Sequence, residues 1–330
     1  MPGPVSERGP RLPSGPSAVT LEDERDLPGT PSNGPPAPGA AAQSRQVLAK
    51  AGGENFPVAP FFLPAAARQD LMAVYGYARL VDDIGDGDLP PGRDDAVWLG
   101  LEGPTEDRLA LLDAFEQDLH RVFTGTPGHP LLRALRPTVL RHRLTPEPFV
   151  KLIEANRQDQ RVRRYASFAE LEAYCELSAN PVGHLVLRVA GAESPERVRR
   201  SDAVCTALQI VEHLQDVAED LTRDRIYLPA EDLARYGVTE ADLARRSASP
   251  AVRELIAFEA GRARELLHEG TPLVGSVHGR LRLLLAGFVA GGNAALDAIA
   301  AADHDVLPGP PRASKFGVLR EVLATLRRKR

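Results

Sequence analysis

Apolar residues recur at three- and four-residue intervals from Gln43 onward, and no stretch alternates strictly between apolar and polar positions. The first spacing indicates helices with a buried face, whereas strict alternation would indicate strands. Glycine- and proline-marked turns divide the pattern, so it predicts an all-α protein. We expect helices at about residues 65–86, 105–123, 129–142, 146–164, 168–190, 195–222, 250–268, 276–302 and 314–328.

The N-terminal segment has a different composition. Residues 1–40 carry ten prolines and six glycines with few large apolar side chains. Such a stretch cannot bury enough surface to offset the entropy lost on ordering. We therefore expect a disordered tail over residues 1–42 and a single helical domain, built around a central cavity, over residues 43–330.

Two breaks interrupt the helical pattern. The acidic stretch with proline and glycine at 87–104 is expected to be a surface loop. Asn180-Pro181 falls inside a long apolar segment, where proline removes a backbone hydrogen bond and frees a carbonyl. The break is either an ordinary kink, a boundary between two shorter helices, or a site where the freed carbonyl faces a polar ligand.

A stripe of polar residues runs along the expected helix at 65–86. Tyr75, Arg79, Asp82 and Asp86 are four, three and four positions apart, which places them on one helix face. The other faces carry mainly apolar residues, which is typical of a buried helix.

The segment at 195–222 repeats this arrangement. Gln209, Glu212, Asp216 and Asp220 follow one another at intervals of three, four and four, again among apolar neighbours. Two buried helices are thus predicted to carry carboxylate ladders.

Buried carboxylates that repel one another need a cation between them. Mg²⁺ prefers oxygen ligands and commonly bridges a few carboxylates to phosphate oxygens, so two facing ladders would suit a magnesium-bound diphosphate. A single Asp-x-x-x-Asp more often marks a solvated helix face. The repetition favours the metal site, and a structural salt-bridge network through Arg79 is the alternative.

Composition narrows the class of protein. With 45 acidic and 40 basic residues, the chain lacks the basic excess of a nucleic-acid-binding protein. Cys175 and Cys205 lie in apolar helical segments and are expected to be reduced, as in the cytoplasm. We find no uninterrupted apolar span or signal peptide, and expect a cytoplasmic protein with peripheral membrane contact as an open alternative.

The C-terminal segment 315–330 would place four apolar residues on one helix face and ends in four basic residues. We expect this face to pack on the bundle, with contact to an anionic membrane as the alternative. The four apolar residues are Phe316, Leu319, Leu323 and Leu326.

From about Gly52 onward the chain resembles the squalene and phytoene synthases, which join prenyl diphosphates head to head. Four collinear elements carry the resemblance: Tyr75 to Asp86, Tyr174-Cys175 with Asn180-Pro181-Val182-Gly183, Gln209 to Asp220, and Arg225-Ile-Tyr-Leu-Pro229. Glu54-Asn55-Phe56-Pro57, Gln215 and Ser178 to Gly183 are most similar to the bacterial hydroxysqualene synthases of hopanoid pathways. Glu212 departs from the pattern, since relatives usually have Asn there.

The resemblance implies an isoprenoid synthase helical bundle that depends on Mg²⁺. It implies Asp82, Asp86, Asp216 and Asp220 as metal ligands, and Tyr174, Tyr75 and Arg79 as catalytic residues. It implies substrate binding by Asn55, Arg79, Asn180, Gln209, Arg225 and Tyr227. On sequence alone, Tyr174 could equally be a core tyrosine with a satisfied hydroxyl.

The implied reaction converts presqualene diphosphate and water into hydroxysqualene and diphosphate, in squalene and hopanoid biosynthesis, alongside companion enzymes of that pathway. One alternative is a presqualene diphosphate or phytoene synthase that condenses two prenyl diphosphates. Another is a non-catalytic helical scaffold that keeps the fold. No Gly-x-Gly-x-x-Gly follows a strand, so a classical dinucleotide site is not indicated.

Overall fold

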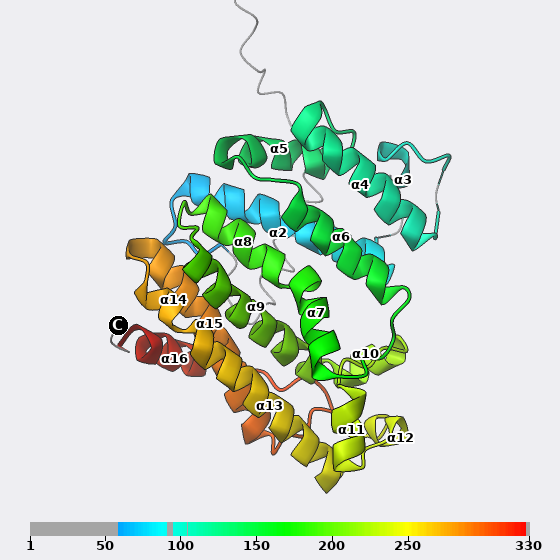
Figure 1. Cartoon of the computed structure of the whole chain (residues 1–330), viewed down its shortest axis with the longest axis vertical. Helices are drawn as coiled ribbons and strands as arrows, with labels where there is room; N and C mark the ends of the chain where they lie inside the picture. Colours follow the sequence, from blue (N-terminus) through cyan, green and yellow to red (C-terminus); the bar gives the residue numbers. More distant parts are fainter. Residues whose placement is uncertain (1–58, 91–94, 104, 328–330) are drawn as a thin grey trace, which may run out of the picture. The chain divides into compact units, whose positions relative to one another are not determined.

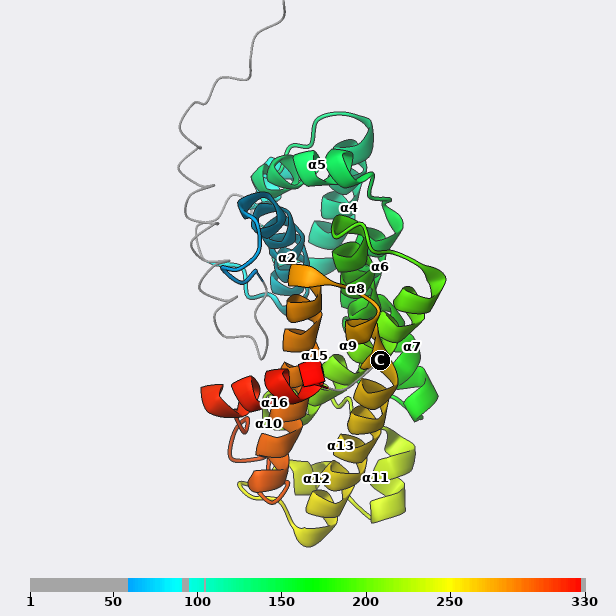
Figure 2. The same ribbon diagram turned by 90° about the vertical axis from the view of Figure 1, so that its left-hand side faces the viewer.

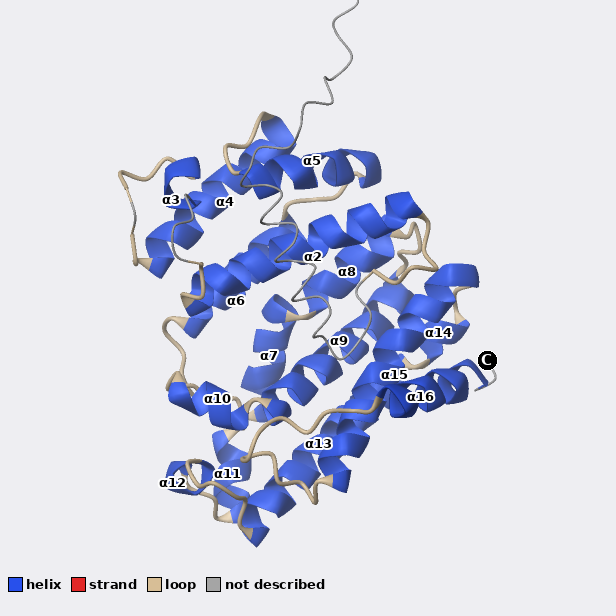
Figure 3. Cartoon of the chain, turned by 180° about the vertical axis from the view of Figure 1, so that it is seen from behind, coloured by secondary structure: helices blue, strands red, loops and turns tan. Residues whose placement is uncertain are grey.

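The computed structural model describes residues 59–90, 95–103 and 105–327, all of which belong to one compact unit. Within these residues the regular structure is helical (Figure 3). The only extended pairing among them is an isolated parallel bridge between Arg164 and Ile226. The all-α prediction is confirmed, and the expected tail at 1–42 lies outside the described residues.

The helices are α2 (Ala65–Asp86), α3 (Asp95–Trp98), α4 (Arg108–Thr124), α5 (Pro130–His142), α6 (Glu147–Asp159), α7 (Phe168–Ser178), α8 (Asn180–Val189), α9 (Pro195–Gln215), α10 (Val217–Thr222), α11 (Ala230–Tyr236), α12 (Glu240–Leu243), α13 (Pro250–Gly270), α14 (Pro272–Gly275), α15 (Gly279–Ala301) and α16 (Lys315–Arg327).

The starts of several helices follow from capping residues. The side chains of Ser167, Ser194 and Ser249 accept hydrogen bonds from backbone N–H groups in the first turns of α7, α9 and α13. These bonds satisfy N–H groups that have no partner inside the helix. Pro195 and Pro250 follow two of these caps, in the first helical position where proline is well tolerated.

Three expected helices differ from those observed. The segment at 168–190 divides into α7 and α8 at Asn180-Pro181, so this break is a helix boundary. The single helix expected at 195–222 is wrong, because Asp216 interrupts it with φ −104° and ψ 12°. The helix expected at 146–164 ends at Asp159, and the residues after it pair with a later segment. There the N–H groups of Ile226 and Ala230 donate to the carbonyl groups of Arg163 and Tyr165.

Four short helices were not expected from the sequence: α3, α11, α12 and α14. Each has between four and seven residues. A helix of one or two turns has too few positions for the apolar pattern to repeat, so periodicity could not find them.

Helix α8 lies between the two helices that carry the carboxylates (Figure 1). Helix α2 packs against α4, α5, α6 and α8, whereas α9 packs against α7, α8, α13 and α15. Leu185 of α8 belongs to the hydrophobic core around α2, and Leu187 belongs to the core around α9. A third, smaller cluster joins Tyr165, Tyr174 and Tyr227.

Helix α15 is long and apolar enough to cross a membrane, but 67% of its most apolar window is buried inside the protein. Ala286, Val289 and Ala290 illustrate this burial, since each is almost inaccessible to solvent. The helix is therefore explained as a core element of the bundle.

The apolar face of the C-terminal helix α16 packs on the bundle only in part. Leu326 packs against the main core, as expected of its apolar face. Phe316, Leu319 and Leu323 do not, because their side chains remain 79%, 54% and 46% exposed. The prediction that all four residues pack on the bundle is wrong for these three.

Candidate active site

The last turn of α2 carries the first group of carboxylates. Asp82 accepts a hydrogen bond of 3.1 Å from the Nδ2 of Asn156 on α6. Arg79 forms a 3.1 Å ion pair with Asp83, one residue beyond Asp82. Gly85 allows α6 to approach this closely, because a Cβ atom at position 85 would lie 1.9 Å from the Oδ1 of Asn156. Helix α6 thus fixes the position of Asp82.

Asp86 ends α2 and connects it to the segment after α10. Its Oδ1 lies 2.6 Å from Nη1 of Arg225, and its Oδ2 lies 2.8 Å from Nη1 of Arg223. Arg223 also reaches Asp88, at 3.1 Å. Two guanidinium groups therefore neutralise the carboxylate at the end of α2.

The second group of carboxylates lies where α9 gives way to α10. Asp216 follows the last residue of α9, and Asp220 lies one turn later in α10. The backbone N–H of Asp220 still donates to the carbonyl of Asp216, at 2.8 Å. The interruption is consequently local, and both residues stay near the end of the same helical segment.

The two groups meet at Arg225. This buried guanidinium pairs with Asp86 and also interacts electrostatically with Asp159 and Asp220. Asp86 and Asp220 in turn repel each other, which is one cause of the raised pKa of Asp220. Asp86 from the first stripe and Asp220 from the second therefore lie around one cation.

Burial raises the pKa values of these carboxylates. The pKa of Asp82 rises to about 7, mainly through desolvation, and repulsion from Asp86 and Asp83 adds to this effect. The pKa of Asp220 rises to about 8 through desolvation and repulsion from Asp216. The pKa of Asp216 is also raised by burial. Carboxylates that are costly to ionise without a cation are suited to binding one.

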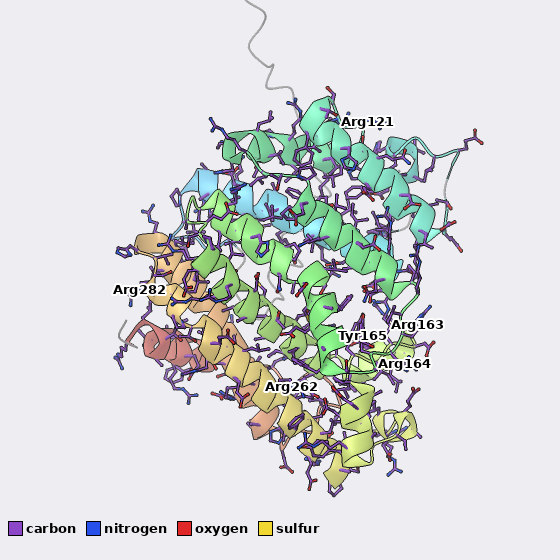
Figure 4. The ribbon with its side chains drawn as sticks, in the orientation of Figure 1. Arg121, Arg163, Arg164, Tyr165, Arg262 and Arg282 are labelled. Atoms are coloured by element: carbon purple, nitrogen blue, oxygen red, sulfur yellow. The ribbon has the colours of Figure 1, made fainter. Side chains whose placement is uncertain are left out.

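A cluster of tyrosines lies beside Arg225. Asp159, the last residue of α6, accepts hydrogen bonds from the hydroxyl groups of Tyr174, at 2.7 Å, and Tyr227, at 3.0 Å. Tyr165, labelled in Figure 4, stacks on Tyr227 with ring centroids 5.8 Å apart. Desolvation raises the pKa of Asp159 to about 6. One buried carboxylate therefore orients two hydroxyl groups.

Asp159 is a site residue that the sequence pattern does not predict. It is a single acidic residue near the end of an amphipathic helix, and such residues commonly face solvent. In the sequence, Asp159 simply precedes Tyr165 and Tyr174, and no periodic spacing indicates that the three residues meet.

His213 lies on α9 against the same cluster. Its ring stacks on that of Tyr227, with centroids 3.7 Å apart and planes at 10°. The side-chain nitrogen of Gln209 lies 3.4 Å from the Nε2 of His213 and 3.5 Å from Glu212, whose side chain is exposed. Burial lowers the pKa of His213 to about 3, so the ring is neutral at physiological pH.

A small pocket opens where these groups meet. Charged and apolar residues share its walls. The lining residues are His213, Val217, Asp220, Arg225, Ile226, Tyr227, Leu228 and Leu243.

The carboxylates fit an open Mg²⁺ site. Among the described residues, no three His, Cys, Asp or Glu side chains are placed to share one metal ion. Mg²⁺ usually keeps several waters and takes one or two carboxylates together with substrate phosphates, so it does not require an all-protein cage. The donor set of Asp82, Asp86, Asp216 and Asp220 consists of the carboxylate oxygens that this ion prefers.

The remaining predicted site residues occupy varied positions. Asn55 lies outside the described residues. Tyr75 is half-buried on α2, and Gln209 is half-buried on α9. Asn180 is buried at the start of α8, where its Oδ1 accepts a 3.1 Å hydrogen bond from Thr206. The substrate-binding roles of Asn55, Asn180 and Gln209 and the catalytic role of Tyr75 stay predictions.

Comparison with known proteins shows consistent similarity. A family model described as squalene/phytoene synthase matches residues 49–317. The hydroxysqualene synthase of Zymomonas mobilis is 35% identical over 229 residues, covering 68% of this chain and 71% of that protein. The 15-cis-phytoene synthase of Synechococcus elongatus is 31% identical over 242 residues, covering 70% of this chain and 74% of that protein.

A solved structure is similar over most of both chains. The crystal structure of a squalene synthase from Alicyclobacillus acidocaldarius has 39% sequence identity and a TM-score of 0.68. The match covers 81% of this chain and 96% of the other.

Proposed function

The chain belongs to the squalene/phytoene synthase family, and from this premise we propose that it converts presqualene diphosphate and water into hydroxysqualene and diphosphate. Membership of the family makes the protein an isoprenoid synthase. The finer assignment is supported by the hydroxysqualene synthase of Zymomonas mobilis, at 35% identity. The subgroup features at Gln215 and at 178–183 favour the same reaction.

One observation carries the proposal: carboxylates from two helices meet around the buried Arg225. The Nε of Arg225 is buried and has no hydrogen-bond partner within the described part of the chain. A guanidinium that already holds Asp86 thus keeps one donor for an anionic group, as diphosphate recognition requires.

The residues around this point support ionisation of presqualene diphosphate to a cyclopropylcarbinyl cation. Arg225 and Arg223 would hold the diphosphate and offset its charge as it leaves. When bound, Mg²⁺ would neutralise further charge on the departing group. The rings of Tyr165, Tyr174 and Tyr227 would shield the carbocation that remains, since the faces of aromatic rings attract cations.

Water would then capture the cation to give the alcohol. Diphosphate leaves with the bonding electrons, the cyclopropylcarbinyl cation rearranges and a C–C bond of its ring breaks, a new C–O bond forms from the ring-opened cation to the water oxygen, and a proton is released to solvent. Tyr174 lies at this site with its hydroxyl group held by Asp159. We propose that this contact sets where the tyrosine points during the reaction.

A second candidate function is condensation of two prenyl diphosphates, as in phytoene synthases. The 31% identity to the 15-cis-phytoene synthase of Synechococcus elongatus favours this alternative. The two functions differ in substrate, because condensation begins from two separate prenyl diphosphates.

The test is to incubate the full chain and Mg²⁺ with presqualene diphosphate, and in parallel with farnesyl or geranylgeranyl diphosphate. The proposal expects rapid consumption of presqualene diphosphate and formation of hydroxysqualene. Consumption of only the linear diphosphates would assign the chain to the condensing enzymes. If none of the substrates is consumed, the catalytic proposal fails.

A further inference from the structure

Helix α16 has one anchored face and one exposed apolar face. Thr325 is buried and Leu326 packs on the main core, while Nη2 of Arg282 donates to the carbonyl of Leu326 at 2.9 Å. Figure 2 shows the helix lying across α15. Phe316 and Leu323, seven positions apart, project from the exposed side with Leu319 between them.

Basic residues surround this exposed face. Lys315, Arg320 and Arg327 on α16 are exposed, as is Arg312 just before it. Residues 315–330 contain six basic residues and one acidic residue, although the whole chain has a net charge of −5. Arg320 pairs with Asp297 and Glu321, so the positive charge on the described helix that carries no ion pair comes from Lys315 and Arg327, with Arg312 beside it.

Most of α16 lies beyond the region that the family model matches. The family model matches residues 49–317 and so ends within the first turn of α16. The exposed apolar face and its basic border extend beyond the matched region.

We propose that the exposed face of α16 docks on an anionic lipid bilayer. An amphipathic helix with apolar side chains on one face and Lys or Arg around them binds at the boundary between lipid headgroups and acyl chains. Each basic residue near an anionic bilayer adds attraction, while the apolar side chains leave water. A second copy of this chain is a poorer occupant, because it would bring like charges together.

The segment before α16 connects this surface to the candidate active site. Nε2 of Gln215 donates a 2.7 Å hydrogen bond to the carbonyl of Pro311. Arg312, which follows Pro311, interacts electrostatically with Asp216, which follows Gln215. Docking at α16 would therefore bring the second carboxylate group near the membrane. This placement would let an apolar C30 substrate pass from the membrane to the site, an advantage that rests on the proposed function. Binding of α16 to lipid does not rest on it.

The test measures binding of the full chain to vesicles in the absence of substrate, so its result is independent of catalysis. Phosphatidylglycerol vesicles are compared with phosphatidylcholine vesicles by co-sedimentation. We expect the wild-type protein to bind the anionic vesicles at least roughly tenfold more tightly, and added salt to weaken that binding. The double variant Phe316→Ser/Leu323→Ser should bind roughly tenfold more weakly.

Leu140→Ser on α5 is the matched control, because Leu140 is 51% exposed on a different helix and its loss should leave vesicle binding unchanged. Circular dichroism checks that all variants keep their helices. Failure of the wild-type protein to bind anionic vesicles would overturn the proposal, as would equal binding by the double variant. A monomer–dimer equilibrium that the double variant abolishes, without vesicle binding, would assign the face to a second copy.

Discussion

Individual carboxylates in this protein have distinct surroundings, and these surroundings suggest distinct roles. Asp86 is neutralised by Arg223 and Arg225, whereas Asp82 accepts a hydrogen bond from the side-chain amide of Asn156. Burial makes ionised Asp82 costly until a cation approaches. We therefore expect Asp82 to contribute more to binding a metal–diphosphate complex than to folding.

Asp82→Ala tests this expectation. Turnover should fall by at least roughly 100-fold, because a group that stabilises charge at the reacting centre is lost. The helical circular dichroism spectrum should stay unchanged, and the rise in melting temperature on adding Mg²⁺ and diphosphate should shrink. Glu172→Ala, at an exposed carboxylate on α7, is the control. Wholesale unfolding of Asp82→Ala would instead support a structural salt-bridge network.

Asp159 is expected to act as a positioning residue. In Asp159→Asn, one acceptor oxygen becomes an NH2 group that only donates, so one of the two tyrosine hydroxyl groups can no longer donate to it and must reorient. We expect kcat to fall by roughly 100-fold through misplacement, with KM less affected.

A double-mutant cycle separates positioning from general damage at Asp159. If Asp159 acts through Tyr174, the variant Asp159→Asn/Tyr174→Phe should lose little more activity than the worse single variant. Fully additive losses in kcat, or a large drop in unfolding midpoint for Asp159→Asn, would argue against the positioning role.

Some residues of the candidate site can be predicted from sequence and others cannot. Asp82, Asp86, Asp216 and Asp220 were identified because fixed spacing repeats on two helices, and the structure brings members of both groups to Arg225. Asp159 has no such repeat, and its role depends on contacts with residues 15 and 68 positions away. Contacts of this kind become visible only in the folded chain.

At the scale of helices, close packing of α2 on α6 supports the first carboxylate group. Gly85 provides the space, and Asn156 uses it to reach Asp82. The sequence predicted the bounds of α2 well because its apolar pattern is long. It did not predict where α6 ends, because pairing between 163–165 and 226–230 decides that point.

Gly85→Ala should disrupt this contact. The added methyl group would overlap Asn156, so we expect a loss of about 1–3 kcal/mol in the free energy of unfolding, together with reduced turnover. Gly261→Ala on α13 is the matched control, since nothing lies within 4 Å of the added Cβ there. Urea unfolding measures both variants. Equal stability of Gly85→Ala and wild type would contradict the packing argument.

The contact between α11 and α13 should make stability depend on pH. Burial raises the pKa of Glu259 to about 8, Arg262 partly opposes this shift, and nearby Asp232 adds to it. Because the folded pKa lies above the unfolded value, the contribution of Glu259 is fully present below about pH 4.5 and is lost as pH rises through about 8.

Glu259→Gln should remove this dependence. Between pH 5 and 8 the unfolding free energy of the wild-type protein should fall more steeply than that of the variant, by up to about 1.4 kcal/mol per pH unit. Glu254→Gln, at an exposed position on the same helix, should keep the wild-type slope. Urea titrations across this pH range measure the slopes, and identical slopes for all three proteins would disprove the assignment.

For the whole molecule, the candidate active site lies among three helical groups. Helix α2 brings one set of carboxylates, α9 and α10 bring the other, and α6 brings Asp159 between them. The fold class could be predicted because long amphipathic helices dominate the chain. The exposed face of α16 could not, since a helix pattern shows which residues share a face but not which face meets the core.

The central claim is that this site ionises presqualene diphosphate and lets water capture the cation. The most direct measurement is mass spectrometry of the neutral product formed with Mg²⁺ in ¹⁸O-labelled water. We predict hydroxysqualene carrying one ¹⁸O atom, at the enrichment of the solvent. An unlabelled alcohol, a hydrocarbon without oxygen, or unconsumed presqualene diphosphate would contradict the account.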